Sequence, residues 1–143
     1  MDIEIHTRSA SKRRFLETFA KVYAKLLNIE NRNGTIIIAT RRDVKSEHEA
    51  EGLTLGMDKD IFIYIQSTMG PGDTARVLAH EMVHAKQHLL GHIKHKTYRG
   101  KSQTYWMGKI NKKDYLNQPW EIAAYRQESM LMHKAIQLIT KGM

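Results

Sequence analysis

The pattern that most constrains the fold lies in residues 74–90, where apolar residues recur every three or four positions. These positions are Ala75, Leu78, Met82, Ala85 and Leu89. The spacing predicts a helix that buries one face, because steps of three and four residues keep side chains on one side of a helix. Asp73 or Thr74 would cap its start, and Gly91 would end it. Other elements of the chain must therefore cover this face.

Two histidines share a second face of this predicted helix, since His80 and His84 stand four residues apart. Imidazoles separated by one helical turn can bind a single metal ion, and zinc is the usual ion for such a pair. Glu81 points to a different side, so it is better placed to take a proton from a water molecule than to bind the same ion. The spacing His80-Glu81-x-x-His84 thus predicts a zinc site with Glu81 as a general base.

A catalytic zinc site needs a third protein ligand, and several downstream residues could provide it. The candidates are His88, His92, His95, Glu121, Glu128 and His133. His88 lies a further turn along the same helix, too far to converge with the motif on one ion. His92 follows Gly91 and stays possible, whereas Glu121 opens a second predicted helix that can pack across from the first. We expect Glu121 to be the ligand, and Glu128, two turns farther, to lie beyond reach of the ion.

The chain before the motif predicts one helix and three short strands. Residues 9–28 carry an apolar stripe with helical spacing, and residues 35–39 form a β-branched run that predicts a strand covered on both faces. Residues 53–57 and 61–65 alternate along their length, which predicts an antiparallel hairpin after a polar loop at 41–51. The strand at 61–65 could offer its edge to an extended peptide or could lie inside the sheet.

The chain after the motif predicts a loop and a final helix. Residues 92–111 are rich in Lys, Arg and Gly and predict irregular chain or a second hairpin around Arg99-Gly100-Lys101. Pro119 suits the first turn of a helix. The apolar stripe expected on that helix is Ile122, Tyr125, Ser129, Met132, Ile136 and Ile139. This order predicts a single α+β domain over residues 1–143, with a small antiparallel or mixed sheet packed on helices.

Composition limits the location and the partners. The chain has no cysteine, which excludes disulfides and cysteine-ligated zinc. No apolar run reaches the roughly 18 residues of a membrane span, and the first residues lack the pattern of a signal peptide, so we expect a cytoplasmic protein without membrane contact. A net charge of +8 has two interpretations: a basic surface that only keeps the protein in solution, or weak, salt-dependent, non-specific binding to nucleic acid. The sequence predicts no particular oligomeric state.

The motif His80-Glu81-x-x-His84, followed by a helix that carries Glu121, resembles that of the gluzincin metallopeptidases. The short chain and its Pro-Trp-Glu-Ile-x-Ala stretch at 119–124 are most similar to the small minigluzincin-type, phage-encoded metallopeptidases. This resemblance implies a zincin-like fold, zinc bound by His80, His84 and Glu121, Glu81 as the general base, and a protein or peptide substrate.

One position departs from the thermolysin-like pattern. Thermolysin has an aspartate four residues after its glutamate ligand, and this aspartate steadies a zinc-binding histidine. The corresponding position here is Tyr125, so another residue must orient the imidazoles. A donor for the negatively charged oxygen of the tetrahedral intermediate is also needed, and the sequence does not choose between the candidates. They are Tyr105, Tyr115, Tyr125 and His133.

Two other interpretations stay open at this point. A DNA-associated protease similar to the SprT-like family would use a third histidine, so His92 or His95 would replace Glu121 as the ligand. A non-catalytic phage or host-interaction protein would use zinc only to tie two helices together. The number of protein ligands separates the first alternative from the gluzincin hypothesis, and peptide turnover separates both enzymes from the second.

Overall fold

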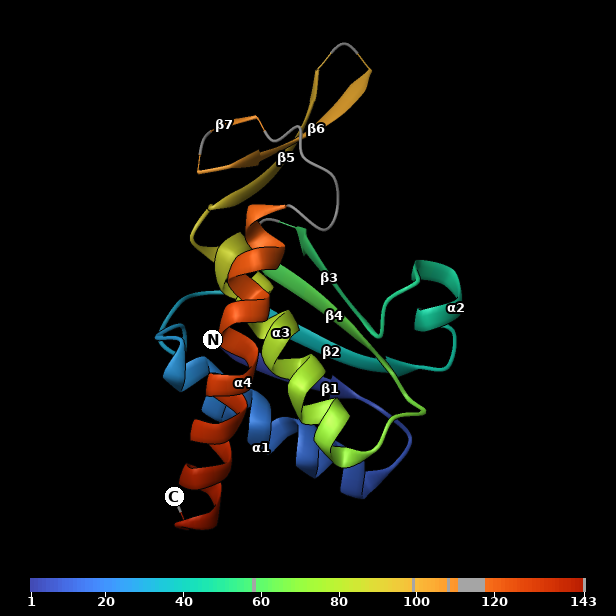
Figure 1. Cartoon of the computed structure of the whole chain (residues 1–143), viewed down its shortest axis with the longest axis vertical. Helices are drawn as coiled ribbons and strands as arrows, with labels where there is room; N and C mark the ends of the chain where they lie inside the picture. The colour runs from blue at the N-terminus through green and yellow to red at the C-terminus, as the bar shows by residue number, and fades with distance from the viewer. Residues whose placement is uncertain (58, 99, 108, 111–117, 143) are drawn as a thin grey trace.

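The computed structural model describes residues 1–57, 59–98, 100–107, 109–110 and 118–142 (Figure 1). Its centre is a four-stranded mixed sheet with the order β1-β2-β4-β3. The strands are β1 (Asp2–His6), β2 (Thr35–Arg41), β3 (Gly52–Met57) and β4 (Asp60–Gln66). β1 and β2 are parallel, as are β2 and β4, whereas β3 is antiparallel to β4 and forms one edge of the sheet.

Helices α1 (Ala10–Leu26) and α3 (Pro71–Leu89) pack on one face of this sheet, and α4 (Pro119–Thr140) packs on these two helices (Figure 1). A short helix, α2 (Val44–His48), precedes β3. Two isoleucines of β2, Ile36 and Ile38, and all three of β4 are fully buried beneath the helices. The buried Tyr23 hydroxyl of α1 donates a hydrogen bond to the Ala75 carbonyl of α3 over 2.8 Å. The α+β class expected from the sequence is confirmed.

A second, three-stranded sheet follows α3 and projects beyond the end of that helix (Figure 1). Its antiparallel strands are β5 (Ile93–Tyr98), β6 (Lys101–Trp106) and β7 (Lys109–Ile110). The hairpin predicted as one alternative for residues 92–111 is therefore present. No helix in the described residues is long and apolar enough to cross a membrane.

The structure differs from the prediction at β1, at β2 and at α2, and it decides the position of β4, which the sequence left open. It has a first strand, β1, that the sequence did not predict because its apolar residues alternate with acidic ones over only five positions. Strand β2 is covered on one face rather than two, since Ile36 and Ile38 are fully buried while Ile37 is half-buried. Helix α2 lies in the segment predicted to be a polar loop. Strand β4 is interior, so the free edge belongs to β3.

The predicted inner face of α4 is wrong by one residue. Ile122, Tyr125 and Ile136, which the apolar stripe placed inside, are exposed. The buried positions are Glu121, Ala124, Glu128, Leu131 and Ala135. These positions also have helical spacing, but two of them are glutamates, so apolar periodicity alone selected the neighbouring face. The two carboxylates therefore point toward α3, against which α4 packs.

Candidate metal centre

Three buried side chains converge between α3 and α4. His80 and His84 lie one turn apart on α3, and Glu121 lies in the first turn of α4. The two histidine Nε2 atoms are 3.2 Å apart, and Glu121 Oε2 lies 3.4 Å from His80 Nε2. Glu121 Oε1 contacts His84 Nε2. One ligand atom from each residue lies within 4.8 Å of the others, which is the arrangement expected around one metal ion.

Separate partners hold the far side of each imidazole ring. His80 Nδ1 lies 3.2 Å from Oε2 of Glu128, a residue that follows Glu121 by about two turns of α4. His84 Nδ1 lies 2.7 Å from Gln87 Oε1, and the Gln87 amide donates to the Trp120 carbonyl over 3.0 Å. An acceptor oxygen at Nδ1 favours the tautomer with the proton there. The Nε2 lone pair then faces Glu121, as a metal-binding imidazole requires.

The donor set fits a divalent metal such as zinc. Glu121 Oε2 is buried and makes no hydrogen bond, although buried carboxylate oxygens are normally satisfied. Two imidazole nitrogens and one carboxylate match the three-ligand set of catalytic zinc sites, which leaves a position for water or substrate. A cation bound between the three residues would satisfy the Glu121 oxygen that the protein leaves without a partner.

The electrostatics of the cluster favour ionised Glu121. Burial alone would raise the pKa of this carboxyl, but the adjacent rings of His80 and His84, when protonated in the metal-free protein, outweigh burial and hold its pKa well below the usual range. For His84, burial opposes the charged form, but contact of the protonated ring with Glu121 and the charge of Glu81 raise its pKa overall. The cluster therefore holds negative charge beside the two Nε2 atoms, where a cation would bind.

Glu81 turns away from this cluster toward β3. Its Oε1 accepts a hydrogen bond of 2.8 Å from the Thr54 hydroxyl, and its side chain is almost completely buried. Burial raises its pKa, and the neighbouring His84 and His80 only partly oppose this shift. A Cβ atom at Gly52 would lie 2.9 Å from Glu81 Cγ and Oε2, so glycine allows β3 to approach the helix closely. Glu81 is thus a fixed carboxylate with raised proton affinity.

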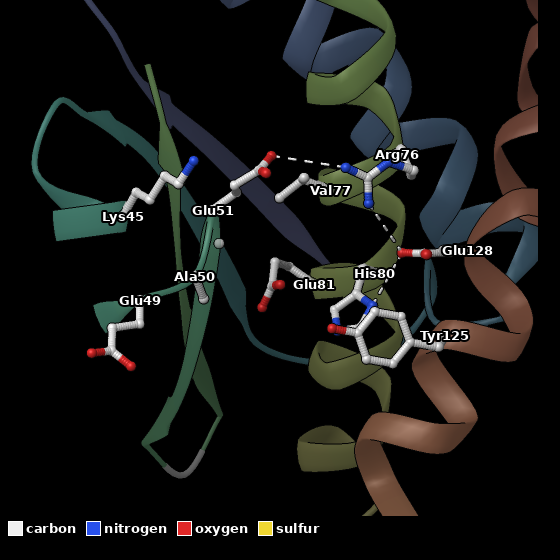
Figure 2. A pocket seen from close by; sticks show the side chains of 11 residues that line it. Lys45, Glu49, Ala50, Glu51, Arg76, Val77, His80, Glu81, Tyr125 and Glu128 are labelled. Atoms are coloured by element: carbon white, nitrogen blue, oxygen red, sulfur yellow. Dashed lines mark hydrogen bonds and ion pairs between the residues drawn. The ribbon is translucent and has the colours of Figure 1, made fainter. Parts of the chain in front are cut away.

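Two adjoining cavities open onto these residues. The first, which we call the charged cavity, has a volume of about 260 Å³ and is lined by His80, Glu81, Tyr125 and several charged residues, as Figure 2 shows. Figure 2 also shows a chain of contacts from Glu51 through Arg76 and Glu128 to His80. The second, the central cavity, has a volume of about 330 Å³. It contacts all four candidate residues, with Leu53, Leu55, Ile93 and Trp120 among its apolar walls.

The remaining candidate ligands lie elsewhere or outside the described residues. His92 packs its ring 6.0 Å from that of Trp106, and His133 Nδ1 faces the Ser129 carbonyl on the exposed side of α4. Neither belongs to the metal cluster found among the described residues. The Tyr125 ring lies 4.6 Å from that of His80 at the charged cavity. Tyr115 and the side chains of His95 and Tyr105 fall outside the described part of the chain.

Sequence reasoning missed Thr54, Gln87 and Glu128 as parts of this site. For Thr54, a usable signal was the pattern of small residues at 52, 54 and 56 on one side of a strand. Glu128 was expected to lie beyond reach of the ion, and it is not part of the metal cluster, but that expectation took no account of the second nitrogen of His80, which Glu128 contacts. Glu128 provides the carboxylate beside His80 that the thermolysin-like pattern would place at position 125, where this chain has Tyr125.

Removing the Glu128 carboxylate is expected to weaken metal binding without removing a ligand. We expect Glu128→Ala to lower zinc affinity by about 10- to 100-fold, because His80 loses the acceptor that fixes its ring. Glu128→Gln keeps an acceptor oxygen and should lose less. Competition titration with a chelator measures both variants. Wild-type affinity in Glu128→Ala would show that His80 needs no such partner.

Comparison with known proteins gave one family match. The family model Peptidase_M91, described as effector protein, matches residues 2–118. The matched range contains His80, Glu81 and His84 and ends three residues before Glu121. The comparisons with curated proteins and with solved structures gave no match.

Proposed function

Because the chain belongs to the Peptidase_M91 family, we propose that it is a zinc-dependent peptidase with His80, His84 and Glu121 as metal ligands and Glu81 as general base. The observation that carries this proposal is the convergence of the three ligand atoms beside a separate, buried carboxylate. The separation of the Glu81 carboxylate from the His80, His84 and Glu121 cluster supports this division between metal binding and proton transfer, which hydrolysis by an activated water requires.

In the proposed mechanism each protein group has a separate role in hydrolysis. Zinc, when bound, supplies a Lewis acid that polarises the scissile carbonyl and promotes ionisation of water. Glu81 takes a proton from the attacking water and later delivers it to the leaving amine, and its raised pKa makes it a stronger acceptor for the first transfer. The Thr54 hydroxyl holds Glu81 in place through its 2.8 Å hydrogen bond. Glu128 and Gln87 keep the two imidazoles oriented.

Tyr125 is the donor that we propose for the developing negative charge on the substrate oxygen. It lines the charged cavity together with Glu81 and packs its ring against that of His80 (Figure 2). Burial and the neighbouring Glu121 and Glu128 raise the pKa of its hydroxyl, so the hydroxyl stays protonated at neutral pH. A protonated hydroxyl near the reacting carbonyl can donate the hydrogen bond that stabilises the tetrahedral intermediate.

The free edge of β3 provides a place for an extended peptide. Among the described residues β3 pairs with β4 alone, and Thr54 at its middle bonds to Glu81. A peptide added to this edge would pair its backbone with β3 and pass the candidate metal centre. We propose that protein or peptide substrates bind here in antiparallel orientation, because antiparallel pairing is slightly more stable per residue than parallel pairing.

Metal removal and restoration test this function. We expect protein reloaded with zinc to hold about one ion per chain and to cleave peptides from a proteome-derived library. A strong chelator should stop cleavage, and added zinc should restore it. Absence of tight zinc binding after reloading would exclude the metalloenzyme. Tight binding without cleavage of any library peptide would instead favour a zinc ion that only ties α3 to α4.

A further inference from the structure

A third cavity, which we call the cationic cavity, lies at the C-terminal end of α3. Its volume is about 820 Å³. Arg32, Lys59 and Lys94 bring three positive charges to its wall from three separate segments of the chain. Among the described residues no Asp or Glu lines it, and none forms an ion pair with these cations. Within the part of the chain that the structure describes, the cavity therefore presents a positive charge in a concave site without an acidic partner.

The cationic cavity adjoins the candidate active site. His88 and Ile93 line both the cationic cavity and the central cavity, which contacts His80, Glu81, His84 and Glu121. Strand β3 runs from one to the other, because Gly52 and Thr54 line the central cavity and Gly56 lines the cationic cavity. A ligand that follows β3 past the candidate metal centre would arrive at Gly56, where the strand joins the wall of the cationic cavity.

The direction of β3 decides which part of a substrate reaches these cations. β3 begins at Gly52, beside Glu81, and ends at Met57, just before Lys59. A peptide paired antiparallel to it has its N-terminal part at the Met57 end. Thr54 marks the level of Glu81 and Gly56 that of the cationic cavity, a separation of about 7 Å at roughly 3.3 Å per residue. Residues upstream of the scissile bond therefore face the cavity.

We propose that the cationic cavity is a specificity site that binds an acidic side chain of the substrate, about two to four residues upstream of the cleaved bond. This inference rests on the proposed peptidase function and gives it a substrate class. Arg32, Lys59 and Lys94 attract the carboxylate, and the concave wall brings it close to several cations at once.

A peptide explains this cavity better than a nucleic acid does. Binding to a duplex requires basic groups spread along a surface that follows the phosphates. The three cations here instead gather in one hollow, at the end of an edge strand that leads into the candidate active site. Backbone pairing with β3 would fix a peptide in register, so that the side chain at one position of the peptide would lie at the cationic cavity.

The test compares matched peptides and matched variants. A peptide cleaved by the zinc-loaded protein is made with Glu or with Gln at the preferred upstream position. We expect kcat/KM to be about three- to tenfold higher for Glu, from a few partly exposed ion pairs. The double variant Lys59→Ser/Lys94→Ser should lose this ratio, and Lys94→Glu should prefer Lys at the same position. Lys134→Glu, an exposed charge change on α4, should behave as the wild type.

The outcomes separate the inference from the function on which it rests. Cleavage without an upstream acidic preference, or a preference unchanged in the double variant, overturns the inference and leaves the peptidase intact. No cleavage of any library peptide overturns the proposed function instead. A binding assay with fluorescein-labelled hexaglutamate and the Glu81→Gln protein needs no turnover, and the double variant should bind about tenfold more weakly. If a 20-base-pair duplex displaces hexaglutamate and binds more tightly to the same three residues, the cavity is a nucleic-acid site and the inference is wrong.

Discussion

Glu81→Gln is expected to abolish nearly all hydrolysis while the metal stays bound. We expect kcat/KM to fall by about 10²- to 10⁴-fold or more, since an amide cannot accept the proton of the attacking water. The amide oxygen can still accept the hydrogen bond from Thr54, so the side chain should keep its place beside β3. Zinc affinity should change by less than about threefold, because Glu81 lies outside the cluster of ligand atoms. Initial rates on one quenched peptide and a chelator competition give the two quantities.

The matched control for this variant is Glu30→Gln, the same chemical change at an exposed position after α1. It should keep both the wild-type rate and the wild-type zinc affinity. If Glu81→Gln instead lost its zinc, Glu81 would be a ligand and the division of tasks between it and Glu121 would be wrong. If it kept more than about a tenth of the wild-type rate, another group would be the base.

The sequence predicted the motif helix well because two signals agreed there. Apolar spacing defined its buried face, and the structure buries Ala75, Leu78, Met82 and Ala85 as expected. Histidine spacing defined the second face independently. The sequence did not show that the second face is buried as well, at 7% exposure for His80 and 6% for His84. Burial of that face depends on α4, whose orientation no local pattern of α3 determines.

The last helix shows why the rest of the site was harder to predict. A functional helix can place carboxylates at core-facing positions, and apolar periodicity then selects the wrong face. Glu121 and Glu128 take two such positions in α4, so Ile122 and Tyr125 move outward. Glu121 was nevertheless chosen from the sequence, because a carboxylate at the start of a packed helix is a chemically suitable third ligand. The partner role of Glu128 required a distance between two helices.

The edge of the sheet also depended on tertiary structure. Alternation predicted the pair formed by β3 and β4, and that pair is present. Which of the two lies at the edge depends on β2, whose parallel pairing with β4 joins residues far apart in the chain. Strand order of this kind follows from packing of the connecting helices rather than from the local sequence of either strand. The identity of the edge strand is consequently a property of the fold.

Glu121→Ala is expected to cause the largest loss of zinc affinity of any change outside the motif. It removes the only carboxylate that contacts both Nε2 atoms in the described cluster, including an oxygen left without a hydrogen-bond partner. We expect a loss greater than the roughly 10- to 100-fold typical for removal of an orienting partner, and hence greater than that of Glu128→Ala. Isothermal titration or chelator competition gives the affinity, and circular dichroism checks that the helices remain.

The competing explanation for Glu121 is that its charge merely stabilises the N-terminus of α4 through the helix dipole. Asp73→Ala tests this explanation directly, because Asp73 is the carboxylate in the first turn of α3 and lies outside the metal cluster. Its removal should lower stability by a similar helix-dipole contribution, about 0.3–1 kcal/mol, and leave zinc affinity unchanged. If Glu121→Ala bound zinc like the wild type while His92→Ala did not bind it, a third histidine would be the ligand. The arrangement would then match the SprT-like alternative, and the buried carboxylate between the two imidazoles would have only a structural role.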